Sequence, residues 1–311
     1  MNNIICIAGP TASSKTALAV ELAKCFNGEV VSCDSMQIYK GMDIGTAKPT
    51  MEERQGIVHH LLDVAEPWED FSVSRYCELA TAAVEDIVAR GKTAIIAGGT
   101  GLYMDSLIKG NDFAPFPSTG MREKLEQQAD EKGLLYMHGL LAGIDPDAAA
   151  KLPVADRKRV IRALEVYYET GETITAHNLR TQSLPPRFSP LWIGLDFASR
   201  AELYHRIDLR VDIMLEQGLL DEIRTLLAKG IDPKATAMQA IGYKEFVSAL
   251  AGNGSVEAAA AEVQQASRRY AKRQLTWFRR NTQMHWLIRE EGQTNGEILA
   301  AARQLVQEYD N

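Results

Sequence analysis

A short apolar run, Ile4–Ala8, is followed directly by residues 9–16, GPTASSKT, and then by a helical pattern over residues 17–23. A phosphate-binding loop of the pattern GxxxxGK[ST] requires this order of strand, loop and helix, because backbone N–H groups and the helix N-terminus converge there on one anion. Three of the four fixed positions match, since Ser14 stands where the second glycine is expected. The sequence therefore predicts a phosphate site here, and residues 9–16 are called the phosphate loop below.

Two side chains of the phosphate loop are expected to act on the phosphates directly. Lys15 would neutralise terminal phosphate oxygens, and the hydroxyl of Thr16 would hold a Mg²⁺ ion that bridges them. If Ser14 adopts a positive φ, the conformation costs about 1–2 kcal/mol. The alternative is a polar turn followed by an N-capped helix.

Further apolar runs predict a sheet of parallel strands buried on both faces. They occupy residues 29–33, 93–97 and 191–195, and helical patterns lie between them. With 46% hydrophobic and 24% charged residues, the chain can bury a core, which excludes a disordered or collagen-like protein. We expect an α/β fold: a P-loop-type parallel sheet core flanked by helices. His59 and His60 are expected to belong to a strand.

Two segments interrupt this pattern, at 111–120 and at 185–190. Between them, residues 121–132 and 156–169 have helical periodicity without a strand pattern, which predicts a small all-helical insertion domain. A chain of 311 residues has the usual length of two domains. The predicted boundaries are 1–114 for the first part of the core, 115–188 for the insertion, and 189–311 for the second part. After its strand, this last part should be largely helical, with helices at 199–216 and 256–280.

Polar residues follow two of the predicted strands, and ligands bind beyond the carboxyl ends of strands in such sheets. Asp34 would lie beside the bound phosphates, either as a Mg²⁺ partner or as a general base on an acceptor. Its alternative role is to cap the following turn. Residues 98–101, GGTG, would bring backbone close to a ligand, although glycines after a strand also form ordinary turns.

Arg206 and Arg210 are spaced i, i+4 on a predicted helix, so both side chains can point in one direction. A forked guanidinium group suits a departing phosphate. The alternative for each arginine is an ion pair with an acidic residue of the same helix: Asp208, Asp212 or Glu216.

Positive charge is concentrated in one segment near the C-terminus. Residues 265–280 contain no acidic residue and six basic ones, Arg268, Arg269, Lys272, Arg273, Arg279 and Arg280. On a helix, one face would carry Arg269, Lys272, Arg273, Thr276 and Arg280, and another would carry Ala271, Leu275 and Phe278. We call the first of these the basic face. A nucleic-acid backbone is its natural partner, and a solvated face with local ion pairs is the alternative. The insertion holds a second cluster: Arg157, Lys158, Arg159 and Arg162.

Other features exclude several classes of protein. The net charge of −7 gives no overall positive field for nucleic acid or membrane. The four cysteines form neither a CxxC pair nor a disulfide framework, which favours the cytoplasm. The apolar runs are too short for a membrane span, and the N-terminus lacks the charge of a signal peptide. The six histidines have no ligand spacing such as HExxH, so no metal site built by the protein alone is expected.

Six blocks of sequence, in order, together resemble the bacterial tRNA dimethylallyltransferases, which prenylate an adenine beside the anticodon. The blocks are GPTASSKT at 9–16, VVSCDSMQIYKGMDIGTAKP at 30–49, AGGTGLY at 97–103, RVIRALEVY at 159–167, QAIGYKE at 239–245 and RRYAKRQLTWFRR at 268–280. They cover most of the chain, and the block at 30–49 is far more specific than the phosphate loop.

The resemblance implies an activity and a set of site residues. The family transfers a dimethylallyl group from its diphosphate to N6 of a tRNA adenine, with Mg²⁺, and releases diphosphate. Asp34 would be the general base and Arg210 a diphosphate contact, acting with Lys15 and with Thr16, which holds Mg²⁺ via the diphosphate. The implied donor-binding residues are Gly9, Thr11, Ala12, Ser13, Ser14, Lys15 and Thr16. The implied tRNA contacts are Asp34, Ser35, Met36, Gln37, Thr100, Arg122, Lys158, Arg159, Arg162, Gln239, Gly242, Tyr243, Lys244, Lys272, Arg273 and Arg279.

Three alternatives stay open from the sequence. An adenylate isopentenyltransferase shares the chemistry but accepts a free nucleotide, and would not need the basic segments. A small-molecule kinase would use Lys15 and Thr16 equally well to bind ATP. A nucleotide-dependent RNA-binding switch would perform no covalent chemistry. For the main interpretation we expect a cytoplasmic monomer that binds tRNA and dimethylallyl diphosphate and does not contact a membrane.

Overall fold

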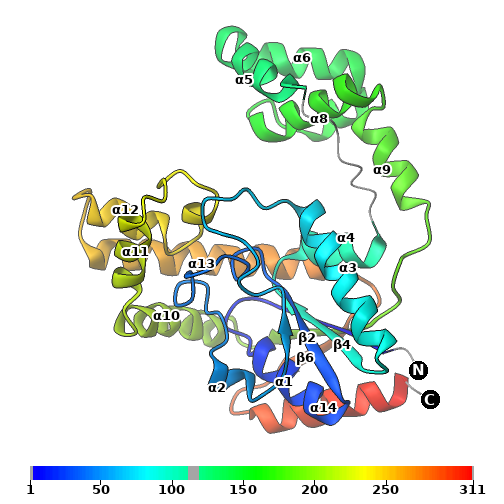
Figure 1. Cartoon of the computed structure of the whole chain (residues 1–311), viewed down its shortest axis with the longest axis vertical. Coiled ribbons are helices and arrows are strands. Elements are labelled where there is room, and N and C mark those ends of the chain that lie inside the picture. The colour runs from blue at the N-terminus through cyan, green and yellow to red at the C-terminus, as the bar shows by residue number, and fades with distance from the viewer. Residues whose placement is uncertain (1–2, 111–118, 310–311) are drawn as a thin grey trace. The chain divides into compact units, whose positions relative to one another are not determined.

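The computed structural model describes residues 3–110 and 119–309, and the chain divides into two compact units (Figure 1). The first unit comprises Met1–Ile108 and Phe188–Asn311, and the second comprises Lys109–Arg187. Of the two interruptions expected from the sequence, most of 111–120 lies outside the described residues. The other, 185–190, is irregular backbone between a helix of the second unit and a strand of the first.

The first unit is built on one sheet of six parallel strands, in the order β3-β2-β4-β1-β5-β6. The strands are β1 (Ile4–Ala8), β2 (Gly28–Cys33), β3 (His59–His60), β4 (Thr93–Gly98), β5 (Leu191–Phe197) and β6 (His285–Arg289). Every residue of β1, β2 and β5 is buried. Their continuous apolar sequences follow from this burial, because a sheet covered on both faces needs no polar side. The expected α/β fold with a parallel sheet is confirmed.

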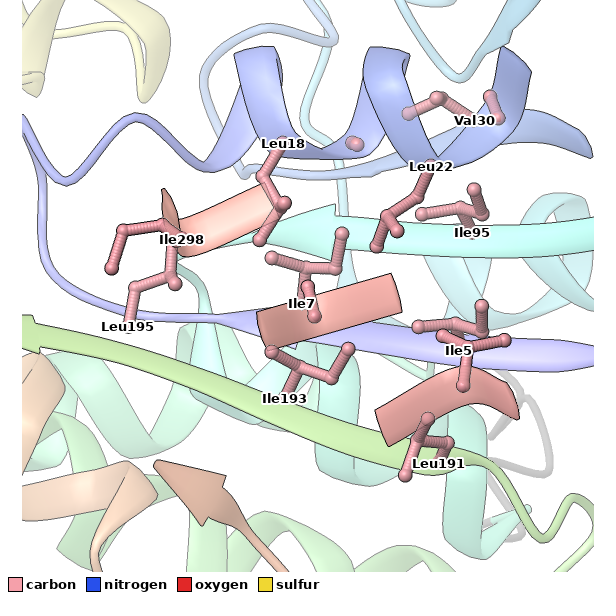
Figure 2. Packing of buried hydrophobic residues seen from close by; sticks show 14 residues of the cluster. Ile5, Ile7, Leu18, Leu22, Val30, Ile95, Leu191, Ile193, Leu195 and Ile298 are labelled. Atoms are coloured by element: carbon pink, nitrogen blue, oxygen red, sulfur yellow. The ribbon is translucent and has the colours of Figure 1, made fainter. Parts of the chain in front are cut away.

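Helices from both ends of the chain cover one face of the sheet. Figure 2 shows Leu18 and Leu22 of α1 (Lys15–Cys25) pointing toward Ile7 and its neighbours in the sheet. Ile298, from α14 (Asn295–Tyr309), packs in the same cluster beside Leu195. This buried layer holds α1, and with it the phosphate loop, rigidly against the sheet.

The remaining helices of this unit are α2 (Met51–Arg54), α3 (Val73–Ala89), α4 (Gly101–Lys109), α10 (Arg200–Glu216), α11 (Leu219–Ala228), α12 (Lys244–Leu250) and α13 (Val256–Phe278). Of these helices, α3 and α10 contact the sheet, whereas α11 and α12 pack with α10, α13 and one another. Phe197 at the end of β5 packs with Ile207 of α10 and with Ala271 and Leu275 of α13. Ala271, Leu275 and Phe278 are buried, as the periodicity of this segment predicts.

Strand β6 is an addition to the elements expected from the sequence. It pairs in parallel with β5, from Ile193 opposite His285 to Phe197 opposite Arg289. It lies at the edge of the sheet, and only its last residue is buried. Its apolar run, Trp286–Ile288, is only three residues long and lies between His285 and Arg289, so it is too short to predict a strand by itself.

The described residues of the second unit form helices and the segments that connect them. Its helices are α5 (Met121–Lys132), α6 (Leu134–Ile144), α7 (Pro146–Lys151), α8 (Arg157–Thr170) and α9 (Ile174–Gln182). Leu125, Met137, Leu141 and Leu164 form the centre of its own hydrophobic core. Asp145 caps α7 and also accepts hydrogen bonds from the backbone and hydroxyl of Thr175, which ties α9 to the other helices.

Candidate active site

Three strands of the sheet end side by side at one edge. Ala8 of β1 and Cys33 of β2 both pair with Gly98 of β4. Gly98 has no space for a side chain, because a Cβ there would lie 2.0 Å from the carbonyl oxygen of Cys33. The phosphate loop, the turn after Cys33 and the loop after Gly98 therefore leave the sheet together.

A cleft of about 700 Å³ opens at this edge, entirely within the first unit. It brings together Thr11, Ser14, Lys15, Thr16, Asp34, Gln37, Lys48, Gly99, Arg206, Arg210, Tyr270 and Gln274. Most of the catalytic and donor-binding residues implied by the resemblance are thus neighbours in space. A cavity of this size holds a small organic ligand.

The phosphate loop has a strained backbone at two residues. Ala12 has a φ of 63° and Ser14 a φ of 65°, both in the left-handed region. Gly9 is required for a different reason, since a Cβ would meet the carbonyl oxygen of Leu195 at 2.8 Å. Ser13 is buried and its hydroxyl donates to the carbonyl of Pro10 at 2.8 Å, which closes the loop on itself. The condition anticipated for Ser14, a positive φ, is therefore met.

Three cations converge on this loop. Lys15 Nζ donates to the carbonyl oxygen of Pro10 at 2.6 Å, and burial followed by the charge of Arg210 lowers the pKa of Lys15 to about 7. Arg210 Nη1 lies 3.5 Å from the hydroxyl oxygen of Thr11, and burial lowers the pKa of Arg210 below its ordinary value. Arg206 donates to the carbonyl oxygen of Ala12 at 3.1 Å. Crowded, partly desolvated cations are favourable for an anionic ligand, which would relieve their repulsion.

Among the residues that the structure describes, Arg206 and Arg210 form no ion pair with the acidic residues of their own helix, α10. Asp208 instead forms an ion pair with Arg268 of α13, and Asp212 accepts a hydrogen bond from Gln264 at 3.2 Å. The alternative of ion pairs within the helix is therefore wrong for these two partners, because they face α13. Both arginines remain directed at the phosphate loop.

Asp34 has a structural contact and still faces the cleft. Its Oδ1 accepts hydrogen bonds from the backbone N–H groups of Met36 at 2.8 Å and Gln37 at 3.4 Å. In the part of the chain that the structure describes, no hydrogen-bond donor contacts the second oxygen, Oδ2. The turn-capping role and a chemical role for this carboxylate are thus compatible, since one oxygen serves each.

Gln274 is a residue of this site that was not expected from the sequence. Its Oε1 accepts from the backbone N–H of Thr11 at 2.9 Å, and its Nε2 donates to the carbonyl oxygen of Gly99 at 3.0 Å. Gly99 permits this contact, because a Cβ there would lie 2.1 Å from Nε2. Tyr270, one turn earlier on α13, also lines the cleft, and burial followed by the charge of Asp34 raises its pKa to about 12. In the sequence, the one indication of a role for Gln274 was an uncharged amide next to the apolar face of a helix that is otherwise basic.

The basic face of α13 is largely exposed. Arg269, Lys272 and Arg273 of α13 are exposed, and so is Arg280, which lies in the turn after Phe278. Within residues 3–110 and 119–309, no acidic side chain pairs with these four. Arg280 stacks over the ring of Trp277, whose indole N–H donates to Asp105 at 2.9 Å. Arg279, by contrast, pairs with the buried Asp196 at 2.9 Å, and Arg268 with Asp208. The basic face therefore keeps a local positive charge.

The sequence matches the family model described as IPP transferase over residues 37–281. The chain belongs to the IPP transferase family. The resemblance inferred from the sequence blocks is thereby confirmed. The chain has relatives of nearly equal length. A protein named tRNA dimethylallyltransferase from Acetivibrio thermocellus is 48% identical over 300 residues, or 96% of each chain. One of the same name from Caldanaerobacter subterraneus is 46% identical over 297 residues.

Solved structures of IPP transferases are similar along the whole chain. The full-length tRNA isopentenylpyrophosphate transferase of Bacillus halodurans superposes with a TM-score of 0.73 at 40% identity, covering 100% of this chain and 99% of that one. A eukaryotic dimethylallyltransferase acting on tRNA superposes with a TM-score of 0.82 at 30% identity, over 98% of this chain and 79% of that one.

The residues that the resemblance implies as tRNA contacts have varied surroundings. The hydroxyl of Thr100 accepts from the backbone N–H of Ser35 at 3.1 Å, beside Asp34 and Met36. Tyr243 is fully buried, so its side chain is part of the protein core. Close to it, Gln239 donates to the carbonyl of Pro233, the backbone N–H of Gly242 donates to Glu245, and Lys244 lies 3.7 Å from Glu245.

The arginines of the basic cluster of the second unit pair with acids. Arg122 and Arg162 both contact Glu165, Arg159 pairs with Asp156, and Arg157 pairs with Glu126 and Asp130. Lys158 is exposed. Local ion pairs, the alternative considered for charged segments, are therefore present on this unit.

Among the described residues, no cluster of three or more histidine, cysteine, aspartate or glutamate side chains could hold a metal ion. The same residues contain no helix that is both long and apolar enough to span a membrane. All four cysteines are free thiols, and Cys6, Cys33 and Cys77 are buried.

Proposed function

We propose that this chain transfers a dimethylallyl group from dimethylallyl diphosphate to N6 of an adenine beside the anticodon of tRNA, releasing diphosphate. The observation that carries the proposal is a single cleft lined by the phosphate loop, Lys15, Arg210 and Asp34. Cations beside one carboxylate suit a reaction in which an anion departs and a proton is removed. Relatives that match 96% of the chain carry the name of this activity.

The cationic side of the cleft would bind and activate the donor. As the C–O bond of dimethylallyl diphosphate breaks, negative charge grows on the departing diphosphate. The backbone N–H groups of the phosphate loop, with Lys15 and Arg210, would stabilise that charge. A bound diphosphate would also raise the pKa of Lys15 from about 7, because a neighbouring opposite charge favours the ammonium form.

Asp34 would act on the acceptor. The N6 amine of adenine is a poor nucleophile because its lone pair is delocalised into the ring, so attack is helped by a base that takes the proton as the C–N bond forms. The hydrogen bonds from Met36 and Gln37 to Oδ1 orient the carboxylate and leave Oδ2 for that proton. The adenine must leave its stack to enter the cleft.

The family resemblance implies Mg²⁺, and the cleft offers suitable donor atoms. The hydroxyl of Thr16 and the carboxylate of Asp34 line it, and Mg²⁺ prefers oxygen ligands and usually takes several of them from phosphates and water. Such an ion would be held by Thr16 together with the diphosphate, where it would neutralise charge on the leaving group.

We assign tRNA binding to the basic face of α13 and to the helical unit Lys109–Arg187. Arg269, Lys272 and Arg273 are exposed cations suited to RNA phosphates. We further infer a location in the cytoplasm, which the four free thiols and the tRNA substrate support, and we keep the monomer as a prediction.

One experiment separates this function from its alternatives. The purified protein is incubated with Mg²⁺ and labelled dimethylallyl diphosphate, in parallel with unmodified tRNA and with AMP, and a further sample contains ATP. Label in tRNA supports the proposal. Label in AMP alone indicates an adenylate isopentenyltransferase, and ATP consumption without label transfer indicates a kinase. Binding of tRNA with neither reaction indicates an RNA-binding switch.

A further inference from the structure

A carboxylate far in sequence from residues 43–45 holds part of the cleft wall. Glu222 of α11 accepts hydrogen bonds at Oε2 from the backbone N–H groups of Asp43 at 2.8 Å and Ile44 at 2.7 Å, and at Oε1 from that of Gly45 at 3.2 Å. Three successive N–H groups pointing at one anion form a nest of the kind that binds phosphates and carboxylates. Here the anion comes from the protein itself.

Tyr243 completes the environment of this carboxylate. Its hydroxyl donates to Oε1 of Glu222 at 2.6 Å, and the side chain is fully buried. Burial, followed by the charge of Glu222, raises the pKa of Tyr243, so the hydroxyl keeps its proton and acts as a donor. The ring lies directly against Gly45, where a Cβ would approach it to 2.5 Å. A carboxylate with four donors is well satisfied, and an amide in its place would not be.

The segment that Glu222 holds reaches Asp34 through one intermediate side chain. Residues 43–48 line the cleft, except for Gly45. Gln37 donates from Nε2 to the carbonyl oxygens of Thr46 at 3.3 Å and Ala47 at 3.1 Å, and its own backbone N–H donates to Asp34. A shift of residues 43–48 is thus transmitted to the turn that orients the proposed base.

We infer that Glu222 is a positioning residue for the transfer reaction: it fixes residues 43–48 of the cleft wall and, through Gln37, the turn that carries Asp34. This inference rests on the proposed function. The phosphate loop is held by other contacts, from Gln274 and Arg206. Loss of the Glu222 carboxylate therefore acts on the chemical step and not on donor binding.

The test compares Glu222→Gln with Asp221→Asn, a matched control on the same helix. Asp221 is exposed, and its carboxylate pairs with Arg224. For Glu222→Gln we expect the single-turnover rate of transfer to tRNA to fall by roughly tenfold to a hundredfold, with the Kd for dimethylallyl diphosphate unchanged within about twofold. Amide hydrogen exchange should accelerate at residues 43–45 and stay unchanged in the phosphate loop. Glu222→Asp, which keeps the charge, should recover part of the rate, and Asp221→Asn should match the wild type.

Two results overturn the inference. In the first, Glu222→Gln reacts at the wild-type rate. In the second, exchange accelerates across the whole unit and donor affinity falls with the rate, which indicates a general contribution to stability. If the wild-type protein transfers no label to tRNA, the proposed function fails instead. The exchange at residues 43–45 then still reports whether Glu222 holds this segment.

Discussion

Arg206 donates a hydrogen bond from Nη2 to the hydroxyl oxygen of Ser14 at 3.0 Å. Ser14 replaces the second glycine of the phosphate-loop pattern and has a φ of 65°, so its backbone is strained. Glycine could not accept this hydrogen bond. A bond from a charged donor contributes about 1.5–3 kcal/mol, which is similar to the conformational cost of about 1–2 kcal/mol. The hydrogen bond from Arg206 of α10 therefore offsets the conformational cost at Ser14.

The first prediction concerns this residue. Ser14→Gly removes both the strain and the hydrogen bond, so stability should change by less than about 1 kcal/mol. Affinity for dimethylallyl diphosphate should be kept or improved, because the backbone N–H groups stay in place. Calorimetric titration of the variant and the wild type measures this. A large loss of binding would show that the loop holds its ligand through the serine side chain.

The second prediction concerns the proposed base. Asp34→Ala should retain tRNA binding and lower the rate of transfer by about 10²–10⁴-fold. Asp34→Asn is the matched variant, because an amide oxygen can still accept from Met36 and preserve the turn. Filter binding and single-turnover assays provide the two measurements. Near-normal transfer by Asp34→Asn would remove this residue from the role of base.

The third prediction follows from the lowered pKa of Lys15. In the protein without ligand this pKa is about 7, and a bound diphosphate raises it. The affinity gained from the ammonium form is therefore fully present below pH 7 and is lost as the pH rises above it, by up to about tenfold per pH unit. Donor Kd values between pH 6 and 9 measure this loss. Lys15→Arg, which stays charged, should show only the pH dependence of the ligand itself. Equal slopes for both proteins would contradict the assignment.

The fourth prediction concerns Gln274. Gln274→Ala leaves the backbone N–H of Thr11 and the carbonyl of Gly99 without their partner, so the free energy of unfolding should fall by about 1–3 kcal/mol. The affinity for dimethylallyl diphosphate should fall as well, because Gln274 holds the backbone of the phosphate loop at Thr11. Gln265→Ala, at an exposed position of the same helix, is the control. Thermal unfolding and donor titration test both expectations, and a Gln274 variant that matches the control in both would refute the bridging role.

The fifth prediction concerns the basic face. Charge reversal at Lys272 and Arg273 should weaken tRNA binding and flatten its dependence on salt, because each phosphate contact contributes roughly one unit to the slope of log K against log salt. Arg268→Gln is the control, since this arginine already pairs with Asp208. Titrations of the protein with tRNA at several salt concentrations measure this slope. An unchanged slope would indicate that tRNA binds to another surface of the protein.

The parts of the site that sequence patterns predicted are those with local signals. The phosphate loop, Asp34 and the basic face of α13 each occupy a short segment whose residue types and spacing indicate a role. Gln274 and Glu222 were not found, because each meets its partner only after folding: Gln274 contacts Thr11, and Glu222 contacts residues 43–45. In the sequence, a polar residue that makes such a long-range contact cannot be distinguished from the other polar residues of its helix.

Ion pairs show the same difference between local contacts, which the sequence indicates, and long-range contacts, which it does not. Arg159 and Arg162 pair with acids three residues away, Asp156 and Glu165, which spacing alone indicates. Arg279 pairs with Asp196 of β5, which spacing does not indicate. Strand β6 was missed for a related reason, since an edge strand is defined by its neighbour in the sheet.

Helix α13 carries the solvated side chains of Arg269, Lys272 and Arg273 on its outer side. At Gln274 it carries the amide that joins the phosphate loop to Gly99. A substitution that tilts this helix would therefore disturb the nucleic acid and the leaving group together. If an α13 variant binds tRNA and the donor more weakly at the same time, the cause would be the displacement of one helix. Such a result would not by itself show that two separate contacts are lost.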